Sequence, residues 1–377
     1  MFMRLCPAAQ RNASPHLWST DRAVSKNAGS ALRLKRIPPP GGAFVSPDGW
    51  IVDRATCRAS RNGGCFQRMH AHSWNPYEDG VRHHACVISL ATQWGDATYH
   101  FPMEALVGLA AVPASLLKRC AVHVTRRRPY VEAWLAAITG RPPMVIDGAI
   151  AAADLYLPEL GHCGRAQRAH VEWLRLHVTS FVERNRSYAR PKGTLLLVER
   201  TAIVAQHRKP DGVHALEVRK TLSSPQQLAK KRIIANFEDG VVRPAAQFAL
   251  AHGLELVNHK DSSLPPLWDQ LERFANARVV LAPLGAAEVM MLAAKAGTCL
   301  VELQEAEWQP SAIQRDGHGG THQPSAQQPT LVRNDSTYKH LADMLGQRYV
   351  RVLTKHWVAD PDAVSAGLAQ CHLLGNL

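Results

Sequence analysis

The fold is decided by a stretch in the second half of the chain, residues 278–303, which reads RVVLAPLGAAEVMMLAAKAGTCLVEL. Residues 278–282 have the apolar, β-branched composition of a buried strand, and residues 283–287 form a tight turn of small side chains. We expect a helix over residues 288–296, capped by Gly297, and a second buried strand over residues 299–303. Strand, helix and strand in this order predict a βαβ unit with parallel strands.

The same alternation of strand and helix patterns extends through both halves of the chain. Further strands are expected over residues 86–90, 119–124, 144–146, 194–198 and 254–257, and helices over residues 101–117, 129–139, 170–185, 242–252 and 267–277. The sequence therefore predicts an α/β fold with two Rossmann-like, parallel-sheet domains. Ligands of such domains bind at the carboxyl ends of the strands.

Breaks in composition divide the chain into segments. The first 36 residues contain seven Lys and Arg side chains against one acid, and the sequence Pro-Pro-Pro-Gly-Gly follows at residues 38–42. Residues 1–42 are therefore expected to form a basic, flexible or targeting-like leader. The break Pro-Lys-Gly at residues 191–193 separates a predicted N-terminal domain, 43–190, from a C-terminal domain, 191–335, which a helical segment, 336–377, closes.

The amino-acid composition excludes several classes of protein. The chain has 377 residues, of which 46% are hydrophobic and 20% charged, and these values exclude disordered and fibrous classes. No apolar stretch long enough to span a membrane is free of charges. The net charge of +13 indicates an anionic substrate, a polyanionic partner or an anionic membrane surface. Because the basic residues are scattered and no nucleic-acid-binding motif accompanies them, we expect no nucleic acid partner.

The cysteines allow several interpretations. Eight cysteines are too few for a disulfide scaffold and leave the redox compartment open. Cys57 and Cys65 precede a group of histidines, which suggests a zinc site, but their spacing fits none of the usual zinc motifs. The histidines are His70, His72, His83 and His84. A disulfide between the two cysteines and a loop of solvated imidazoles remain alternatives, and we predict no bound metal.

The turn at residues 283–287 carries the clearest chemical signal. A small-residue turn between a strand and a helix exposes backbone N–H groups and the positive end of the helix dipole, which suits a phosphate or diphosphate. Gly285, Ala286 and Ala287 would let such an anion approach closely. Glu302, at the expected end of the next strand, is placed to accept hydrogen bonds from ribose hydroxyls. The alternative is close packing of the helix on the sheet, which also needs small residues.

Several segments carry motifs in a fixed order. They read YHFPME at residues 99–104, LLLVER at 195–200, KRIIANFE at 231–238 and FANARVVLAPLGAA at 274–287. Together with residues 338–349 and 357–364, they resemble the signature of glycosyltransferase family 61. That family includes plant xylan-decorating transferases and the animal EGF-domain O-GlcNAc transferase. The resemblance extends from residue 87 to residue 364.

The resemblance implies a GT-B fold, in which two Rossmann-like domains face each other across a cleft. It also implies that the C-terminal domain binds a nucleotide sugar, with UDP as the expected nucleotide. The sugar would be transferred to a hydroxyl of a glycan or glycoprotein acceptor, with inversion of the anomeric centre and without a metal ion. Because the nucleotide sugar is a substrate, no cofactor is expected.

The matched motifs assign roles on the acceptor side. His100 and Glu104, spaced for one face of a helix, are the candidates for the base that deprotonates the acceptor hydroxyl. The alternative is a histidine that caps or packs a helix.

On the donor side, Arg200 and Arg232 are the expected diphosphate clamps, because a guanidinium is permanently charged and offers bidentate donors. Ordinary surface arginines are the alternative. Asn236 and Glu238 are assigned to the hydroxyls of the donor, and for Asn236 a helix N-cap is the alternative.

The chain departs from the family pattern at the turn itself. The family usually has His-Gly-Ala where this chain begins with Leu284, and a Thr-Asn pair where it has Val289 and Met290. Loss of a charge-assisted contact to the diphosphate costs about 1.5–3 kcal/mol. The alternative function is therefore a diverged, non-catalytic family member that binds a glycan or a nucleotide.

Location follows from the resemblance too. Family members usually act in the secretory pathway, in the Golgi or ER lumen, behind an N-terminal anchor helix. No anchor pattern is present in this chain, so membrane association is expected through a missing or atypical N-terminus. Asn-x-Ser sequons at Asn12, Asn185 and Asn334 agree with a lumenal location.

Overall fold

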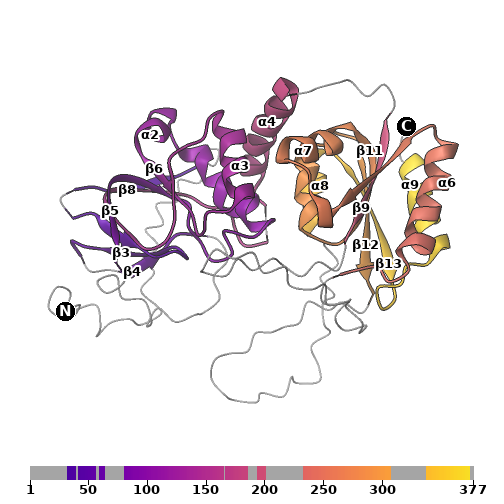
Figure 1. The fold of residues 1–377 in the computed structure, drawn as a ribbon, viewed down its shortest axis with the longest axis horizontal. Coiled ribbons are helices and arrows are strands. Elements are labelled where there is room, and N and C mark those ends of the chain that lie inside the picture. Colours follow the sequence, from indigo (N-terminus) through magenta and orange to yellow (C-terminus); the bar gives the residue numbers. More distant parts are fainter. Residues whose placement is uncertain are drawn as a thin grey trace, which may run out of the picture. The chain divides into compact units, whose positions relative to one another are not determined.

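The structure, a computed structural model, describes residues 32–39, 41–56, 59–63, 80–164, 166–185, 193–200, 232–306 and 337–373. The chain forms two compact units, Met1–Asn185 and Arg186–Leu377, and each has its own sheet (Figure 1). Among the described residues, no helix is both long enough and apolar enough to cross a membrane.

The first unit is built on a mixed eight-stranded sheet. Four parallel strands form one side of it in the order β8-β5-β6-β7, with β7 at the edge, and antiparallel strands extend it beyond β8. The strands are β1 (Leu34–Ile37), β2 (Ala43–Val45), β3 (Trp50–Asp53), β4 (Ala59–Arg61), β5 (Arg82–Ser89), β6 (Ala121–His123), β7 (Val145–Ile146) and β8 (Ile150–Pro158). The α/β class is therefore confirmed, but the prediction of a purely parallel sheet is wrong for this unit.

Strand β1 lies within the segment predicted to be a flexible leader, and for these residues that prediction is wrong. The strand pairs antiparallel with β8, and Ile37 is buried in the core. Arg36 binds Asp154 of β8 with an Nε–Oδ1 distance of 2.9 Å, and its guanidinium lies 5.6 Å from the centre of the Tyr156 ring. The hydrogen bond from Arg36 lowers the pKa of the Asp154 carboxyl.

The apolar segment at residues 101–117 forms three short helices instead of the single predicted one. They are the π-helix η1 (Phe101–Ala105), the 3-10 helix η2 (Leu106–Ala111) and α2 (Ala114–Arg119). Pro113 ends the run because it has no N–H to donate, and Val112 before it is extended, with φ −97° and ψ 119°. Helices α3 (Pro129–Thr139) and α4 (Arg168–Asn185) agree with the prediction.

The second unit contains a five-stranded sheet with parallel pairing throughout its described strands, in the order β10-β9-β11-β12-β13. The strands are β9 (Thr194–Glu199), β10 (Glu255–Lys260), β11 (Ala277–Pro283), β12 (Cys299–Glu305) and β13 (Arg348–Thr354). Helices α6 (Arg243–Ala251) and α9 (Pro361–Leu373) cover one face, and α7 (Leu267–Asn276) and α8 (Thr337–Leu345) cover the other (Figure 1). The parallel sheet predicted for this half is confirmed.

Alternate residues of these strands build the core under α6 and α9. Leu195 and Leu197 of β9 join Val279 and Leu281 of β11 in one buried cluster, as the two-residue period of a strand requires. Two predicted helical segments differ. The 3-10 helix η5 (Ala286–Leu292) replaces the α-helix expected over residues 288–296, and residues 336–377 contain strand β13 as well as helices.

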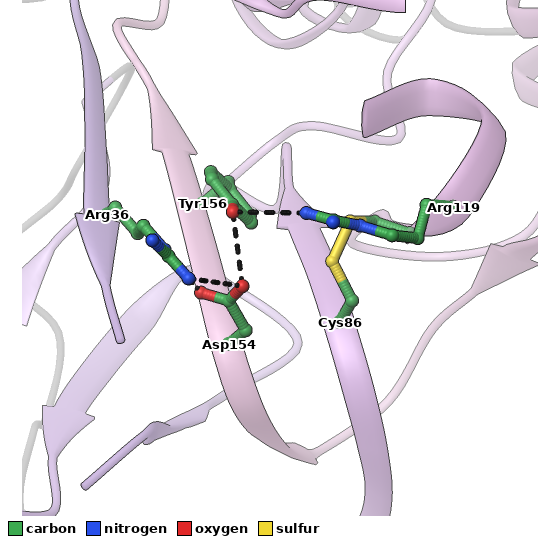
Figure 2. Close-up of a disulfide and its surroundings, with 6 residues drawn as sticks. Arg36, Cys86, Arg119, Asp154 and Tyr156 are labelled. Atoms are coloured by element: carbon green, nitrogen blue, oxygen red, sulfur yellow. Dashed lines mark hydrogen bonds and ion pairs between the residues drawn. A yellow bond between two sulfur atoms is a disulfide. The ribbon is translucent and has the colours of Figure 1, made fainter. Parts of the chain in front are cut away.

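Disulfides tie elements together inside each unit. Cys86 of β5 is bonded to Cys120, next to β6, and Figure 2 shows this bond beside Arg36, Arg119, Asp154 and Tyr156. In the second unit a disulfide joins Cys299 of β12 to Cys371 of α9. The sequence assigned neither pairing. The two cysteines of the zinc hypothesis, with His70 and His72, lie outside the described residues.

Candidate functional site

The strand order of the second unit creates a switch point between β9 and β11. From β9 the chain passes to β10 on one side, and it then returns to β11 on the other side. Sheets with this order bind ligands at the carboxyl ends of the two strands that flank the switch point. Arg200 directly follows β9, and residues 284–287 directly follow β11. This edge of the sheet is therefore the candidate site.

Two arginines converge on the turn after β11. Arg200 Nη1 donates a hydrogen bond to the Leu284 carbonyl at 3.2 Å, and Arg232 Nη1 donates to the same oxygen at 3.4 Å. Arg232 has a left-handed backbone, with φ 57°. Burial and, next, the neighbouring Arg232 charge lower the pKa of Arg200, while Asp261 opposes this shift. The structure thus brings together two of the predicted residues from segments distant in sequence.

Gly285 is required for space and not for backbone freedom. Its φ of 174° is an extended conformation that any residue adopts. A Cβ at this position would lie 2.6 Å from Nη1 and 2.9 Å from Cζ of Arg200, so a larger residue would displace the guanidinium from this position. Ala286 and Ala287 begin η5 and are half-buried. Because η5 is a 3-10 helix of seven residues, the arginines are the main source of positive charge here.

Glu288 is a functional candidate that the sequence reasoning missed. It is fully buried in η5, and its Oε2 accepts a hydrogen bond from the Gly285 amide at 3.4 Å. Burial, and then the nearby charge of Glu302, raise the pKa of Glu288 well above its ordinary value, while Arg200 and Arg232 oppose this. A glutamate at the third helical position is the second half of a capping box, but Gly285 stands where the Ser or Thr of the first half would be, so the sequence signal for this contact is weak.

Glu302 does not lie at the end of its strand, where the sequence predicted it. It is the fourth residue of β12 and not its last, because the strand continues to Glu305 in register with β13. Its carboxyl is fully buried, and Oε2 accepts a hydrogen bond from the Tyr349 hydroxyl of β13. The predicted contact with ribose hydroxyls would therefore compete with Tyr349.

The remaining two donor-side candidates, Asn236 and Glu238, take no part in the hydrogen bonds of the arginine pair to Leu284. The Asn236 amide binds the backbone of Ala359 twice, donating to its carbonyl and accepting from its N–H, both at 2.8 Å. Asn236 therefore ties the start of η3 (Glu238–Val242) to the segment before α9, and it is not the N-cap. Glu238 is exposed at the first position of η3.

In the first unit, the two predicted catalytic residues are in direct contact. His100 Nδ1 lies 2.8 Å from Oε1 of Glu104, and the Gly164 amide donates to the same oxygen at 3.0 Å. The Glu104 side chain is fully buried, whereas 29% of the His100 side chain is exposed. A carboxylate on Nδ1 favours the tautomer with the proton there, which makes Nε2 the basic nitrogen.

The structure thus contains two groups of candidate residues in different units. Arg200, Arg232 and Gly285 meet at the switch point of the second unit, and His100 meets Glu104 in the first. Within the described ranges, no group of three or more His, Cys, Asp or Glu side chains is placed to hold a metal ion.

Comparison with known proteins adds no relative: no protein-family model matches the chain, and no curated protein matches it.

Proposed function

We propose that the second unit binds the diphosphate of a nucleotide sugar at the carboxyl edge of β9 and β11. The observation that carries this proposal is the convergence of Arg200 and Arg232 on the Leu284 carbonyl. Two partly desolvated guanidinium groups repel each other. A diphosphate would offset that repulsion and accept charge-assisted hydrogen bonds from both.

The protein is, in this proposal, an inverting glycosyltransferase of GT-B arrangement, and its acceptor is a glycan or glycoprotein. Nε2 of His100 takes the proton of the acceptor hydroxyl as that oxygen attacks the anomeric carbon of the donor. The bond between this carbon and the phosphate oxygen breaks, and Arg200 and Arg232 stabilise the leaving UDP. Glu104 positions the imidazole, and a single displacement inverts the anomeric centre.

A secretory location is part of the same proposal. Disulfides persist in oxidising compartments and are rare in the cytosol. The bonds Cys86–Cys120 and Cys299–Cys371 support a lumenal location for both units.

Calorimetric titration of the chain with UDP, and with GDP, CMP and ADP as comparisons, tests the donor site. We expect selective binding of UDP and a loss of about tenfold or more in affinity in Arg200→Gln, as for removal of one charge-assisted hydrogen bond. Arg243→Gln is the matched control, because Arg243 is exposed and pairs with Asp239 four residues earlier. Absence of binding to every nucleotide by folded protein would contradict the transferase.

A non-catalytic binding protein is the second candidate, and the side chains at the turn favour it. Leu284 and Met290 stand where the resembling family has polar groups, and both are buried, with 6% and 4% exposure. They are therefore part of the apolar core and offer no contact to a diphosphate. Binding of UDP without transfer or hydrolysis of any UDP-sugar would support this candidate over the enzyme.

A further inference from the structure

Trp94, in the first unit, combines an exposed side chain with an unusual backbone conformation. Its side chain is 47% exposed, and its backbone is left-handed, with φ 65°. A single exposed apolar side chain is common and needs no explanation. A bulky residue with positive φ is a genuine outlier. Together they leave a strained backbone that holds an aromatic ring in solvent.

Trp357, a second left-handed tryptophan among the described residues, provides a comparison for Trp94. Trp357 has φ 56°, but its side chain is 1% exposed and belongs to the core of the second unit. Burial of the ring therefore offsets the backbone strain at Trp357. The Trp94 side chain, which is 47% exposed, is buried far less. Strain of this kind, when packing does not account for it, is found at ligand sites.

The loop that carries Trp94 is held firmly by its neighbours. Thr125 Oγ1 donates to the Thr92 carbonyl at 2.7 Å and accepts from the Thr92 amide at 3.1 Å. The Gly95 amide also donates to the Thr92 carbonyl, at 2.9 Å. A Cβ on Gly95 would lie 2.5 Å from Thr125 Oγ1, so the loop has no room for another side chain there. The backbone on both sides of Trp94 is therefore held in place.

The loop that carries Trp94 leads along the chain to His100, the proposed base. It follows the carboxyl end of β5, the edge at which α/β sheets bind ligands. Backbone hydrogen bonds from Ala97 to Trp94, at 2.8 Å, and from Phe101 to Ala97, at 2.9 Å, lead directly to His100. Trp94 and the base candidate are thus parts of one continuous turn.

A group of paired charged side chains begins two residues after Trp94. Asp96, two residues after Trp94, pairs with Arg128 at 2.9 Å and with Arg126 at 3.8 Å. A protein partner would need apolar neighbours around the ring, because interface centres are depleted of charge. A sugar ring needs the opposite, since it has an apolar C–H face and a rim of hydroxyls.

We propose that Trp94 is a platform on which a neutral sugar ring of the acceptor stacks, with Asp96 and Arg128 binding its hydroxyls. The negative face of the indole attracts the polarised C–H groups of a pyranose. This inference rests on the proposed transferase and specifies its acceptor as a neutral oligosaccharide bound next to His100.

The test uses the full chain labelled with ¹⁵N in its indole groups, with the Trp94 signal identified from Trp94→Phe. Four neutral probes are titrated: xylohexaose, cellohexaose, mannohexaose and N-acetylchitohexaose. At least one is expected to shift the Trp94 signal. Trp94→Asn should weaken that binding by ~10-fold or more, equivalent to ~1.4 kcal/mol, whereas Trp94→Phe keeps a ring and stays close to wild type.

Two features make the result decisive. Asn adopts the left-handed conformation more readily than tryptophan does, so Trp94→Asn should keep the thermal midpoint of the wild type. Trp268→Ala, which removes a 38% exposed tryptophan on α7 of the second unit, is the matched control and should bind as wild type. The proposal is overturned if no probe shifts Trp94, or if Trp268→Ala weakens binding as much as Trp94→Asn.

A UDP titration of the same samples separates this inference from the transferase itself. UDP binding without any response of Trp94 overturns the platform and leaves the donor site standing. Sugar binding at Trp94 without UDP binding supports the platform and overturns the transferase.

Discussion

Two of the fully buried glutamates, Glu104 of the first unit and Glu288 of the second, have different partners. Glu104 lies in η1, where Oε1 accepts from the Gly164 amide and contacts His100. Glu288 lies in η5, where Oε2 accepts from the Gly285 amide and Oε1 has no hydrogen-bond partner among the described residues. Equal burial therefore gives unequal roles. Glu104 contacts the imidazole of His100. Glu288 contacts the backbone of the glycine turn, and its surroundings raise its pKa.

Removing Glu104 should have the largest effect. Glu104→Ala leaves His100 and the Gly164 amide without their shared acceptor and opens a cavity in the core, so we expect a loss of about 3–5 kcal/mol in the free energy of unfolding. Glu104→Gln keeps an acceptor oxygen and should cost about 1 kcal/mol. Urea unfolding followed by the near-ultraviolet signal measures both. Equal stability of the two variants would contradict this prediction, because neither the retained acceptor oxygen nor the filled space would then stabilise the fold.

A second comparison involves two buried histidines. His123 of β6 donates through Nε2 to the Gly148 carbonyl at 2.9 Å, so Nδ1 accepts from the Ser89 hydroxyl at 3.1 Å. His259 of β10 has no hydrogen-bond partner on either nitrogen in the described part of the chain. His123→Leu should cost about 2 kcal/mol because two polar groups lose a partner, whereas His259→Leu should be neutral within about 1 kcal/mol.

The two histidines should nevertheless respond alike to acid. Burial lowers the pKa of both from 6.5 to about 4, so the unfolded chain binds a proton that the folded chain does not. The corresponding stability is complete above pH 6.5 and is lost as the pH falls toward 4, by about 3 kcal/mol for each histidine. Hydrogen exchange of β6 and β10 at pH 7 and pH 5 reports each unit separately. Protection that is independent of pH in the wild type would contradict this.

Much of the fold was predictable because apolar runs with clear breaks have few alternative structures. The strands expected over residues 194–198, 278–282 and 299–303 are present as β9, β11 and β12. Strand β8 was missed because its first half, Ile150 to Ala153, is rich in alanine, which has low strand propensity. The break before α2 has a local cause in the sequence, Pro113, which cannot donate a backbone hydrogen bond. The pairing of cysteines cannot be deduced from spacing.

The candidate site was predictable only in part. The motif order identified Arg200, Arg232 and Gly285, and the structure brings these three together. The burial of Glu302 and the Asn236 contact with Ala359 depend on β13 and the segment before α9, which are distant in sequence. Long-range packing of this kind leaves no local pattern.

The smallest expected effect concerns the contribution of Glu288 to the pH dependence of stability. A carboxyl whose pKa is raised on folding binds a proton that the unfolded chain releases above about pH 4.5. The wild type should therefore lose stability as the pH rises above that value. Glu288→Gln replaces the carboxyl by a neutral group of the same shape that does not titrate. The stability of this variant should therefore fall less between pH 5 and pH 8 than that of the wild type.

Urea unfolding at these two pH values measures the difference directly. At pH 5 the variant should lie within about 1 kcal/mol of the wild type, because glutamine has the same shape and an oxygen for the Gly285 amide. At pH 8 it should equal or exceed the wild type. Glu104→Gln is the internal comparison, since its glutamate is equally buried but in contact with an imidazole. If Glu288→Gln were instead destabilising by the same amount at both pH values, Glu288 would be acting as an ionised partner of Arg200 and Arg232, and the contrast between the two glutamates would disappear.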